Sequence, residues 1–584
     1  MQTSTRYCAT SLIFILIIAI QSATQANAAD LTQPIIRYDT IHRDIEGYYG
    51  MVVSQNHLAT QVGHDVLARG GNVVDAAVAM GFALAVTLPR AGNLGGSGFM
   101  LVYLADKGET IALDYRAMAP MSRPESKNRT EQGEIHWDKL TFGPNASGVP
   151  GTVAGLHEAW KQYGSLPWDV LVQPAIDLAE NGIVVWPDLH FVLDKARQVL
   201  SYFPSTKEIY LRPDGTPWQP GELLVQRDLA WSLKQIQQHG ADAFYKGALA
   251  ERIVAAFAPH DNHFTAKDLA AYQVKYRDPV STDYRGHKVT SMPPSSAGGI
   301  TLLQMLNMLE RFDIKSLQAG SAAQLHLLAE VMKRAAANRR TYVGDPDFVE
   351  IAIGGYLSKA LAAKMIETID PDKASAVKDI RPAPIADYES RDTTHYSVMD
   401  AQGNAVSNTY TLGYSFGSGF VAQGTGILFD NQLRNFYVSR GYDGPNKYQP
   451  GKRMISTMTP TIVFADDKPF LVTGTPGGSR IINAVLQVIV NVVDFDMTIA
   501  DATHMPRIHQ GWNSQTLHYE TGFSPDTLAI LRQKGHSIRQ QQSMASTQSI
   551  LFKDGKYLGS ADPRRPNAKA MGLIKPPSKM STDQ

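Results

Sequence analysis

The sequence predicts an α+β fold in which β-sheets are sandwiched between helices. From about residue 150 to residue 380, apolar residues recur mainly at helical spacing. From Thr393 onward, apolar and polar residues alternate as they do in strands, and turn residues separate the alternating runs. Helices gathered before Thr393 and strands after it are expected to pack as layers on a common core.

The expected helices and strands can be placed by residue number. Helices are expected at residues 72–86 (capped by Asn72), 150–163, 171–181, 227–239, 300–312, 322–340 and 479–493. Strands are expected at residues 99–103, 110–115, 394–399, 405–411, 461–464 and 470–473, and around residues 554–555. The tail after Pro566 shows no periodicity and is expected to be loose.

Composition is that of an ordinary globular protein. Of the 584 residues, 43% are hydrophobic and 19% are charged. This length is ample for a large core and by itself suggests about four domains. Lysine plus arginine and aspartate plus glutamate each number 55, so the formal net charge is zero. Nothing in this balance calls for a nucleic acid or an anionic membrane as a partner.

Residues 1–28 have the features of a secretory signal peptide. Arg6 gives a basic start, and the apolar run at residues 12–20 is too short to span a bilayer. Residues 26–28 (Ala-Asn-Ala) fit a small-x-small cleavage site, so the mature chain is expected to begin at Ala29. The alternative is an uncleaved membrane anchor.

The single cysteine, Cys8, lies within this segment. A mature chain without cysteine excludes disulfides, thiolate metal ligands and a cysteine nucleophile. An export signal on such a chain favours a bacterial periplasmic or secreted protein without a stable membrane anchor. The glycine loop at residues 92–98 lacks the Lys-Ser/Thr of a phosphate-binding loop, and no cofactor or metal ion is expected.

Residues 392–400 predict a cut site followed by a catalytic strand. A threonine hydroxyl is a weak nucleophile without a nearby base. If the bond between Asp392 and Thr393 breaks, Thr393 gains a free α-amine with a pKa of about 7.7–8.0, which can take the hydroxyl proton near neutral pH. The alternative for this stretch alone is an ordinary strand with exposed threonines.

Three downstream features can complete such a site. Backbone N–H groups of Gly477 and Gly478, at the start of a helix, can hold an oxyanion. Thr411 ends the second strand of a hairpin and can lie beside Thr393, and residues 456–459 form a hydroxyl-rich stretch before a strand. Taken singly, each has a plain structural explanation: a helix entry, a strand threonine and a polar loop.

Together these stretches resemble the γ-glutamyltransferases, which are self-cleaving N-terminal-nucleophile hydrolases. The resemblance covers nearly everything after about residue 50. The matching motifs are residues 70–72, 92–96, 114–116, 393–398, 403–406, 409–412, 456–461 and 473–480.

The resemblance implies the fold and the processing. The fold implied is an αββα sandwich of two stacked antiparallel sheets covered by helices. Cleavage between Asp392 and Thr393 gives a large subunit, residues 29–392, and a small catalytic subunit, residues 393–584, which stay together as a heterodimer. Thr393 is then the nucleophile, and Thr411 supports its hydroxyl. Gly477 and Gly478 line the oxyanion hole.

The resemblance also implies how the substrate binds. Arg116 pairs with the α-carboxylate of a glutamyl group through its forked donors, and Gln432, Ser456 and Thr457 complete the cradle. Thr393 attacks the γ-amide of a glutathione-like compound, and water or the amine of an amino acid or peptide takes the glutamyl group.

Three departures from the family pattern bear on the identity of the substrate. Asn435 stands where an aspartate usually pairs with the substrate's α-ammonium, and Gly413 stands where many members have a polar residue. Residues 435–456 are too short for the full lid loop of some members. Related acylases release glutaryl side chains, which lack the α-amine, from cephalosporin-type amides. Such an activity is the main alternative.

Two further alternatives are weaker. Residues 413–417 match the Gly-x-Ser-x-Gly elbow of serine hydrolases, but a glycine-broken loop follows where that motif needs a helix. A non-catalytic relative that only binds is disfavoured because Thr393, Thr411, Gly477 and Gly478 are all present.

Overall fold

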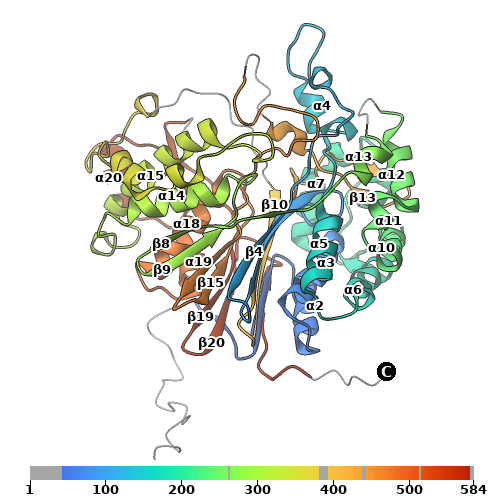
Figure 1. The fold of residues 1–584 in the computed structure, drawn as a ribbon, viewed down its shortest axis with the longest axis horizontal. Helices are drawn as coiled ribbons and strands as arrows, with labels where there is room; N and C mark the ends of the chain where they lie inside the picture. Colours follow the sequence, from blue (N-terminus) through green and yellow to red (C-terminus); the bar gives the residue numbers. More distant parts are fainter. Residues whose placement is uncertain (1–41, 261–263, 381–391, 437–441, 512–513, 579–584) are drawn as a thin grey trace, which may run out of the picture. The chain divides into compact units, whose positions relative to one another are not determined.

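Two stacked antiparallel sheets form the centre of the fold (Figure 1). In this computed structural model the described residues are 42–260, 264–380, 392–436, 442–511 and 514–578. The expected signal peptide at residues 1–28 and the expected start at Ala29 lie outside these ranges. Asp44–Gln584 is one compact unit. Within the described ranges, no helix has both the length and the apolar character needed to cross a membrane.

The first sheet has strands from both ends of the chain. Among the described residues its strand order is β1-β20-β19-β15-β14-β9-β8, with β1 at Ile45–Gly47, β20 at Lys556–Ala561, β19 at Gln548–Lys553, β15 at Lys468–Thr473, β14 at Thr461–Ala465, β9 at His287–Ser291 and β8 at Val280–Tyr284. Every neighbouring pair in this sheet is antiparallel.

The second sheet contains the expected catalytic strand near its middle. Its order within the described residues is β21-β2-β10-β11-β3-β4-β7, with β21 at Lys569–Gly572, β2 at Gly50–Ser54, β10 at Asp392–Asp400, β11 at Ala405–Gly413, β3 at Ser97–Leu104, β4 at Glu109–Tyr115 and β7 at Lys275–Arg277. These neighbours are also all antiparallel.

The inner faces of the two sheets pack against each other. Phe99 and Leu101 of β3 belong to one buried apolar cluster with Ile462 of β14 and Val472 of β15. The rings of Tyr103 and Phe464 meet edge to face across the sheets, with their centroids 4.9 Å apart. The period of two in a strand sends alternate side chains to opposite faces, so each sheet has a second apolar face for helices to cover.

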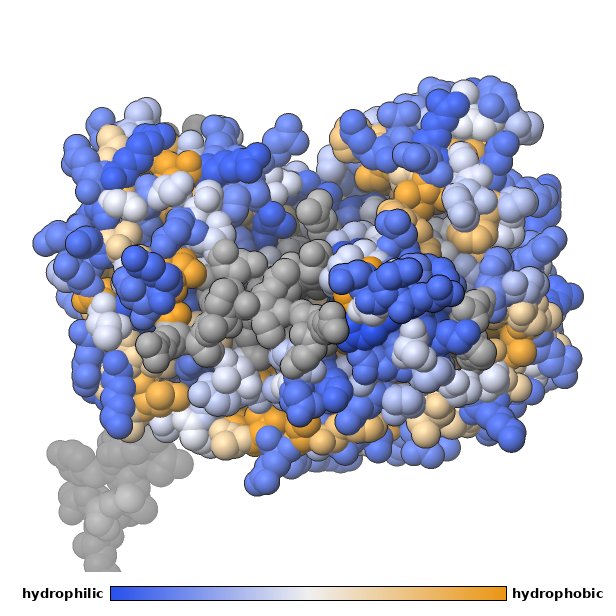
Figure 2. All heavy atoms as spheres, turned by 90° about the horizontal axis from the view of Figure 1, so that it is seen from above, coloured by the Kyte–Doolittle hydropathy of each residue, from blue (hydrophilic) through white to orange (hydrophobic). Residues whose placement is uncertain are grey.

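Helices cover both outer faces, which completes the αββα sandwich that the resemblance implied. On the side of the β10 sheet, Figure 1 shows α2 (His57–Ala68), α3 (Val73–Thr87), α5 (Thr152–Tyr163), α6 (Trp168–Asn181) and α10 (Arg227–His239). On the other side it shows α14 (Gly298–Leu309), α15 (Ala322–Tyr342) and α18 (Arg480–Val493). The face on which α4 lies is mainly hydrophilic, with hydrophobic side chains in separate small areas (Figure 2). Among the described residues the remaining α-helices are α4 (Trp137–Thr141), α7 (Pro187–Lys195), α8 (Arg197–Leu200), α9 (Pro204–Tyr210), α11 (Asp242–Tyr245), α12 (Ala248–Phe257), α13 (Ala266–Ala270), α16 (Ile353–Tyr356), α17 (Lys359–Ile366), α19 (Ile499–His504) and α20 (Pro525–Gln533).

Helix α3 shows why the expected helices were recognisable. All of its residues are buried, as its nearly all-apolar sequence predicts. The side chain of Asn72 accepts hydrogen bonds from the N–H groups of Val74 and Asp75, and Asp75 bonds back to the N–H of Asn72. This capping box confirms the predicted start of the helix.

One prediction about the fold was wrong, and a second was correct but incomplete. The expected loose tail contains β21, which pairs with β2 at the edge of the sheet. The region expected to be mainly helical contains β7, β8 and β9. These strands have three to five residues and lie at or next to sheet edges, so too few residues show the alternation that marks a strand.

Candidate active site

A bulge in the hairpin of β10 and β11 sets the geometry at the predicted cut. Asp392 pairs with Gly413 and Thr394 pairs with Tyr410, so the register shifts by one residue between these pairs. Thr393 is therefore opposite two residues, Thr411 and Leu412. A bulge of this kind re-aims side chains, and it brings the hydroxyls of Thr393 and Thr411 together.

Thr411 bonds to both partners of the expected reaction. The Oγ1 of Thr393 donates to the Oγ1 of Thr411 at 3.2 Å. Thr411 donates in turn to the carbonyl oxygen of Asp392 at 2.6 Å and accepts from the N–H of Gly413 at 2.9 Å. All three hydrogen-bonding positions of the Thr411 hydroxyl are thus used. One side chain thus contacts both the predicted nucleophile and the carbonyl of the predicted cut site.

The side chains that follow Thr393 on the same face of β10 point toward the other sheet. His395 bonds to Thr409 at 2.8 Å and to Ser397 at 3.0 Å, and Ser397 donates to the carbonyl of Gln548 at 2.9 Å. Burial lowers the pKa of His395 to about 3, so this imidazole is neutral at physiological pH. It is a structural group rather than a base.

The two predicted oxyanion glycines lie just beyond the point where His395 meets the other sheet. A side chain at Gly474 would collide with the His395 ring, so the chain passes very close to β10 there. Gly477 and Gly478 follow, with φ of +140° and +60°, before α18 begins at Arg480. No described residue accepts a hydrogen bond from their N–H groups. Unpaired donors at a helix start suit an oxyanion.

A chain of hydrogen bonds joins the predicted substrate residues to Thr411. The Nε2 of Gln432 donates to the carbonyl of Thr411 at 3.1 Å. Ser97 donates to the Oε1 of Gln432 at 2.9 Å and accepts from Arg116 at 3.5 Å. The structure therefore links Arg116 and Gln432 to Thr411, and through Thr411 to Thr393, the predicted nucleophile. Ser97 was missed because a single serine after a glycine turn carries no signal of its own.

Arg116 is fully buried and held by carbonyl groups. Its Nε and NH2 donate to the carbonyls of Met454 and Ile455, each at 3.2 Å. Burial lowers its pKa to about 10, so it remains charged near neutrality. Of five guanidinium N–H groups, three donate to described residues, so donors remain for a carboxylate.

Ser456 and Thr457 connect this arginine to the glycines. They directly follow Ile455, and Thr457 donates to the carbonyl of Gly478 at 2.9 Å. The Oγ of Ser456 accepts from the N–H of Met458 at 3.1 Å. The predicted cradle and the predicted oxyanion donors are thus parts of one connected site.

The γ-glutamyltranspeptidase sequence pattern matches residues 59–572 of this chain. The chain belongs to the γ-glutamyltranspeptidase family. It is 45% identical over 558 residues to the glutathione hydrolase proenzyme of Escherichia coli K12, covering 93% of this chain and 95% of that protein.

Solved structures of related enzymes agree with this assignment. The structure is similar to a cephalosporin acylase from Bacillus halodurans, with a TM-score of 0.82 and 28% identity over 93% of this chain and 100% of that one. It is also similar to Helicobacter pylori γ-glutamyltranspeptidase, with a TM-score of 0.56 and 40% identity over 59% of this chain and 97% of that one.

The departures from the γ-glutamyltranspeptidase pattern have physical settings in the structure. The Oδ1 of Asn435 is buried and finds no hydrogen-bond partner among the described residues. The guanidinium of Arg434 lies over the Tyr414 ring, 4.1 Å from its centroid, and donates to Thr141 at 2.9 Å. Gly413 has φ of +99°, and a side chain there would collide with Asn431. Part of the short lid stretch, residues 437–441, lies outside the described residues.

Asp430 is a second group that the sequence did not reveal. It accepts from the N–H groups of Gln432 at 2.9 Å and Gly148 at 3.0 Å. Burial raises its pKa to about 7, against the opposing effects of these hydrogen bonds and of the charge of Arg116. It holds the start of the segment that carries Gln432.

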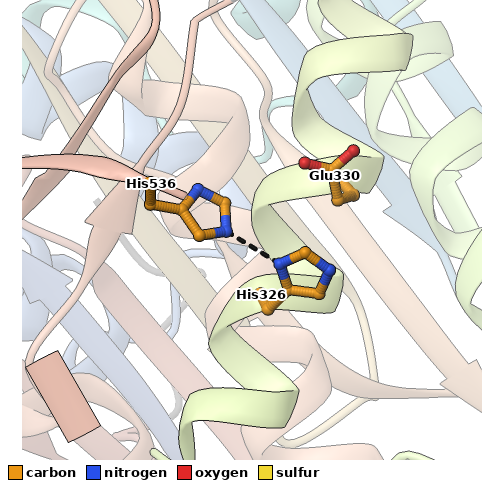
Figure 3. A group of neighbouring side chains, drawn as sticks. All are labelled: His326, Glu330 and His536. Atoms are coloured by element: carbon orange, nitrogen blue, oxygen red, sulfur yellow. Dashed lines mark hydrogen bonds between the residues drawn. The ribbon is translucent and has the colours of Figure 1, made fainter. Parts of the chain in front are cut away.

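A separate group of side chains has the donor types of a metal site (Figure 3). His326 and Glu330 lie on α15, and the Nδ1 of His326 is 2.8 Å from the Nε2 of His536. Both oxygens of Glu330 are already bonded, one by Lys333 and one by Arg334, each at 2.7 Å. Burial opposes ionisation of Glu330, but the charge of Lys333 and these bonds lower its pKa to about 2. Two cations at the carboxylate disfavour a metal ion.

Proposed function

We propose that this protein is a self-processing γ-glutamyl hydrolase and transferase that cleaves the γ-amide of glutathione-like compounds. One arrangement carries this proposal: the Thr393 hydroxyl donates to Thr411, and Thr411 donates to the carbonyl of Asp392. The same nucleophile serves both reactions, first on its own chain and then on the substrate. The similarity to a glutathione hydrolase proenzyme supports both roles.

Maturation begins with attack of the Thr393 Oγ1 on the carbonyl carbon of Asp392. The C–N bond between the two residues breaks, an ester to Oγ1 forms, and the hydroxyl proton ends on the new α-amine. Water then hydrolyses the ester, giving a carboxyl group on Asp392 and a free hydroxyl on Thr393. The products are residues 29–392 and residues 393–584. The matched H. pylori chain covers only 59% of this chain although 97% of it is matched, which fits a polypeptide with the length of a large subunit.

Turnover uses the α-amine that the cut creates and the Thr393 hydroxyl that ester hydrolysis restores. The α-amine of Thr393, with an ordinary pKa of about 7.7–8.0, takes the proton of the Thr393 hydroxyl as the oxygen attacks the γ-carbonyl. The N–H groups of Gly477 and Gly478 hold the oxyanion. The amine of the cleaved γ-amide takes this proton and leaves. Water or an acceptor amine then releases the glutamyl group from the acyl-enzyme.

The head group of the substrate is held on the side of Arg116. Arg116 pairs with the α-carboxylate, and Gln432, Ser456 and Thr457 complete the cradle. The unpaired Oδ1 of Asn435 accepts from the α-ammonium. Asn446 fixes the backbone of Asn435 by donating to its carbonyl at 2.8 Å.

A glutaryl acylase is the second candidate function, and Asn435 favours it. Asparagine offers an acceptor oxygen but no charge, so it distinguishes an α-ammonium from a methylene group less strongly than an aspartate does. The similarity to a cephalosporin acylase supports the same candidate.

The predicted signal peptide at residues 1–28 supports a place of action outside the cytoplasm. A cleaved signal peptide at these positions sends the protein to the periplasm or the medium, where the two subunits act as a heterodimer on small-molecule amides.

Expression followed by two assays tests the proposal. N-terminal sequencing of the shorter band is expected to give Thr-Thr-His-Tyr. The purified enzyme is expected to hydrolyse a γ-glutamyl anilide faster than a glutaryl anilide. An uncut and active protein contradicts the mechanism, and a strong preference for the glutaryl anilide selects the second candidate.

A further inference from the structure

The side chain of the residue before the predicted cut is held by two arginines. The Oδ1 of Asp392 is 3.0 Å from the NH1 of Arg90 and 3.6 Å from the NH2 of Arg565. The side chains of Arg90 and Asp392 are 7% and 19% exposed, so water screens their pair poorly. Neither arginine belongs to the cradle around Arg116.

Both arginines are carried by firmly held turns. Arg90 lies in the turn after α3, and its carbonyl accepts from the N–H of Phe416 at 3.0 Å. Arg565 lies in the turn after β20, where its N–H donates to the carbonyl of Asp562 at 3.2 Å. Asp562 is itself held by Arg507 at 2.8 Å. One arginine precedes the predicted cut in sequence and the other follows it, yet both reach the same carboxylate oxygen.

Asp392 is thereby fixed at two points. Thr411 holds its carbonyl oxygen at 2.6 Å, and Arg90 holds its carboxylate at 3.0 Å. Fixing both groups of one residue removes the rotation that would turn the carbonyl away from the Thr393 hydroxyl. Restricting a reactant to its reactive orientation can supply a large part of a rate enhancement.

We propose that Arg90, assisted by Arg565, is a positioning residue for self-cleavage, which it serves by holding the Asp392 side chain so that the Asp392 carbonyl faces Thr393. The inference rests on the proposed self-cleavage. The arginines transfer no proton and form no bond in the reaction.

Electrostatics agree with a pair assembled around a carboxylate. Burial, and then the nearby charge of Arg565, lower the pKa of Arg90 to about 10, and Asp392 opposes both effects. Two cations this close repel each other, and the Asp392 carboxylate is the charge between them. An ion pair that only stabilised the fold could lie anywhere in it. Here both arginines contact Asp392, the residue before the predicted cut.

The test measures the rate of cutting directly. The full chain is made by cell-free translation with a labelled amino acid, and conversion of the full-length band is followed after synthesis is stopped. Wild type, Arg90→Gln, Asp392→Asn and the double variant form a cycle. Each single change is expected to slow cutting about tenfold to a hundredfold, the range for a lost charge-assisted hydrogen bond that the transition state keeps.

The double variant decides whether the two residues act through each other. It is expected to cut no more slowly than the slower single variant, because either change alone already removes the contact. Arg90→Lys is expected to cut faster than Arg90→Gln, and added guanidinium ion to speed Arg90→Ala. Arg285→Gln is the matched control: it removes a 3.1 Å ion pair with Asp494 in a different part of the fold, and cutting should keep its wild-type rate.

The outcomes separate this inference from the proposal beneath it. If the wild-type chain is not cut before Thr393, self-cleavage itself is wrong. If wild type is cut and both Arg90→Gln and Asp392→Asn are cut as fast as wild type, the positioning role is wrong. It is also wrong if the rate losses of the two single variants add up in the double variant. Thermal melts of uncut Arg90→Gln and Arg565→Gln show whether slow cutting merely reflects a damaged fold. The inference is also overturned if their melting temperatures lie well below that of Arg285→Gln and guanidinium ion does not speed the cutting of Arg90→Ala.

Discussion

Two buried polar clusters, one around Thr393 and one around Glu330, differ in what their polar atoms are bonded to. Around Thr393, the N–H groups of Gly477 and Gly478 and the Oδ1 of Asn435 have no partner among the described residues. Around Glu330, Lys333 and Arg334 take both carboxylate oxygens, and of the three metal-type side chains only His536 keeps a nitrogen without a described partner. Buried polar groups are normally paired, so a cluster that keeps unpaired groups is a better candidate for a reactive site than one chosen by residue type.

The largest expected effect is at the nucleophile. Thr393→Ala is expected to abolish both cutting and turnover, and Thr393→Ser to keep part of each because a hydroxyl remains. A gel, N-terminal sequencing and a γ-glutamyl anilide assay measure this. Thr394→Val is the matched control, since the Oγ1 of Thr394 has no described partner. Normal maturation of the alanine variant would move the nucleophile elsewhere.

The next effect is at Arg116. Arg116→Lys keeps the charge but loses the planar fork, so it is expected to raise KM. One lost charge-assisted hydrogen bond, roughly 1.5–3 kcal/mol, corresponds to a fall in kcat/KM of about tenfold or more. Steady-state kinetics with the γ-glutamyl anilide give this value, with Arg285→Lys as a control away from the site. A lysine variant with wild-type kinetics would show that Arg116 does not bind substrate.

A smaller effect is expected at Asn435. Asn435→Asp adds a charge to the unpaired acceptor, so it is expected to favour γ-glutamyl over glutaryl substrates by about 1–2 kcal/mol more than the wild type does, roughly a factor of ten. Paired measurements of kcat/KM on the two anilides test this. Equal responses of the two substrates would mean that this side chain does not contact the α-position.

The smallest effect on activity is expected in the other cluster. Burial, followed by the charge of Lys333, lowers the pKa of His536 to about 4. The unfolded chain binds this proton near pH 6.5, so the stability from the neutral imidazole is complete above pH 6.5 and declines as the pH falls toward 4. His536→Gln is expected to reduce this decline in melts across that range and to leave the anilide assay unchanged.

Zinc ions sharpen the same comparison. Because Glu330 is bonded to two cations, added Zn²⁺ is expected to leave the melting temperature of the wild type unchanged. A rise that EDTA reverses and that His326→Gln removes would show instead that the cluster binds metal.

The sequence was most informative where the signal lay in consecutive residues. The run of apolar residues after Asn72 predicted a buried helix, and the motifs around Thr393 and Gly477 predicted groups that the structure brings to one site. What the sequence could not show depends on pairs far apart in the chain. The bulge opposite Thr393 alters the register of the hairpin without a local signal. The bond of Ser97 to Gln432 and the pairing of Arg90 with Asp392 each join segments hundreds of residues apart.

The corrections have the same origin. β21 forms because β2 offers it an edge, and β7 to β9 form because the two sheets offer edges to short segments. Such strands are stabilised by their neighbours more than by their own residues, which is why propensity and alternation underestimated them. The hydroxyl of Thr394, buried without a described partner, is equally unreadable from a Thr-Thr pair.

The order of strands has a consequence for whether the protein can refold after it has been cut. β10 and β11 lie between β2 and β3, and β14 pairs with β9, so a cut before Thr393 leaves each sheet woven from two polypeptides. The pieces can reach that arrangement easily only while they are one chain, because separate chains must also meet in solution. Thermal unfolding of the mature enzyme is therefore expected to be irreversible. Its stability is then described by the rate of unfolding rather than by an equilibrium free energy. The predicted cut would remove the covalent link that holds the strands of the two pieces together while the chain folds.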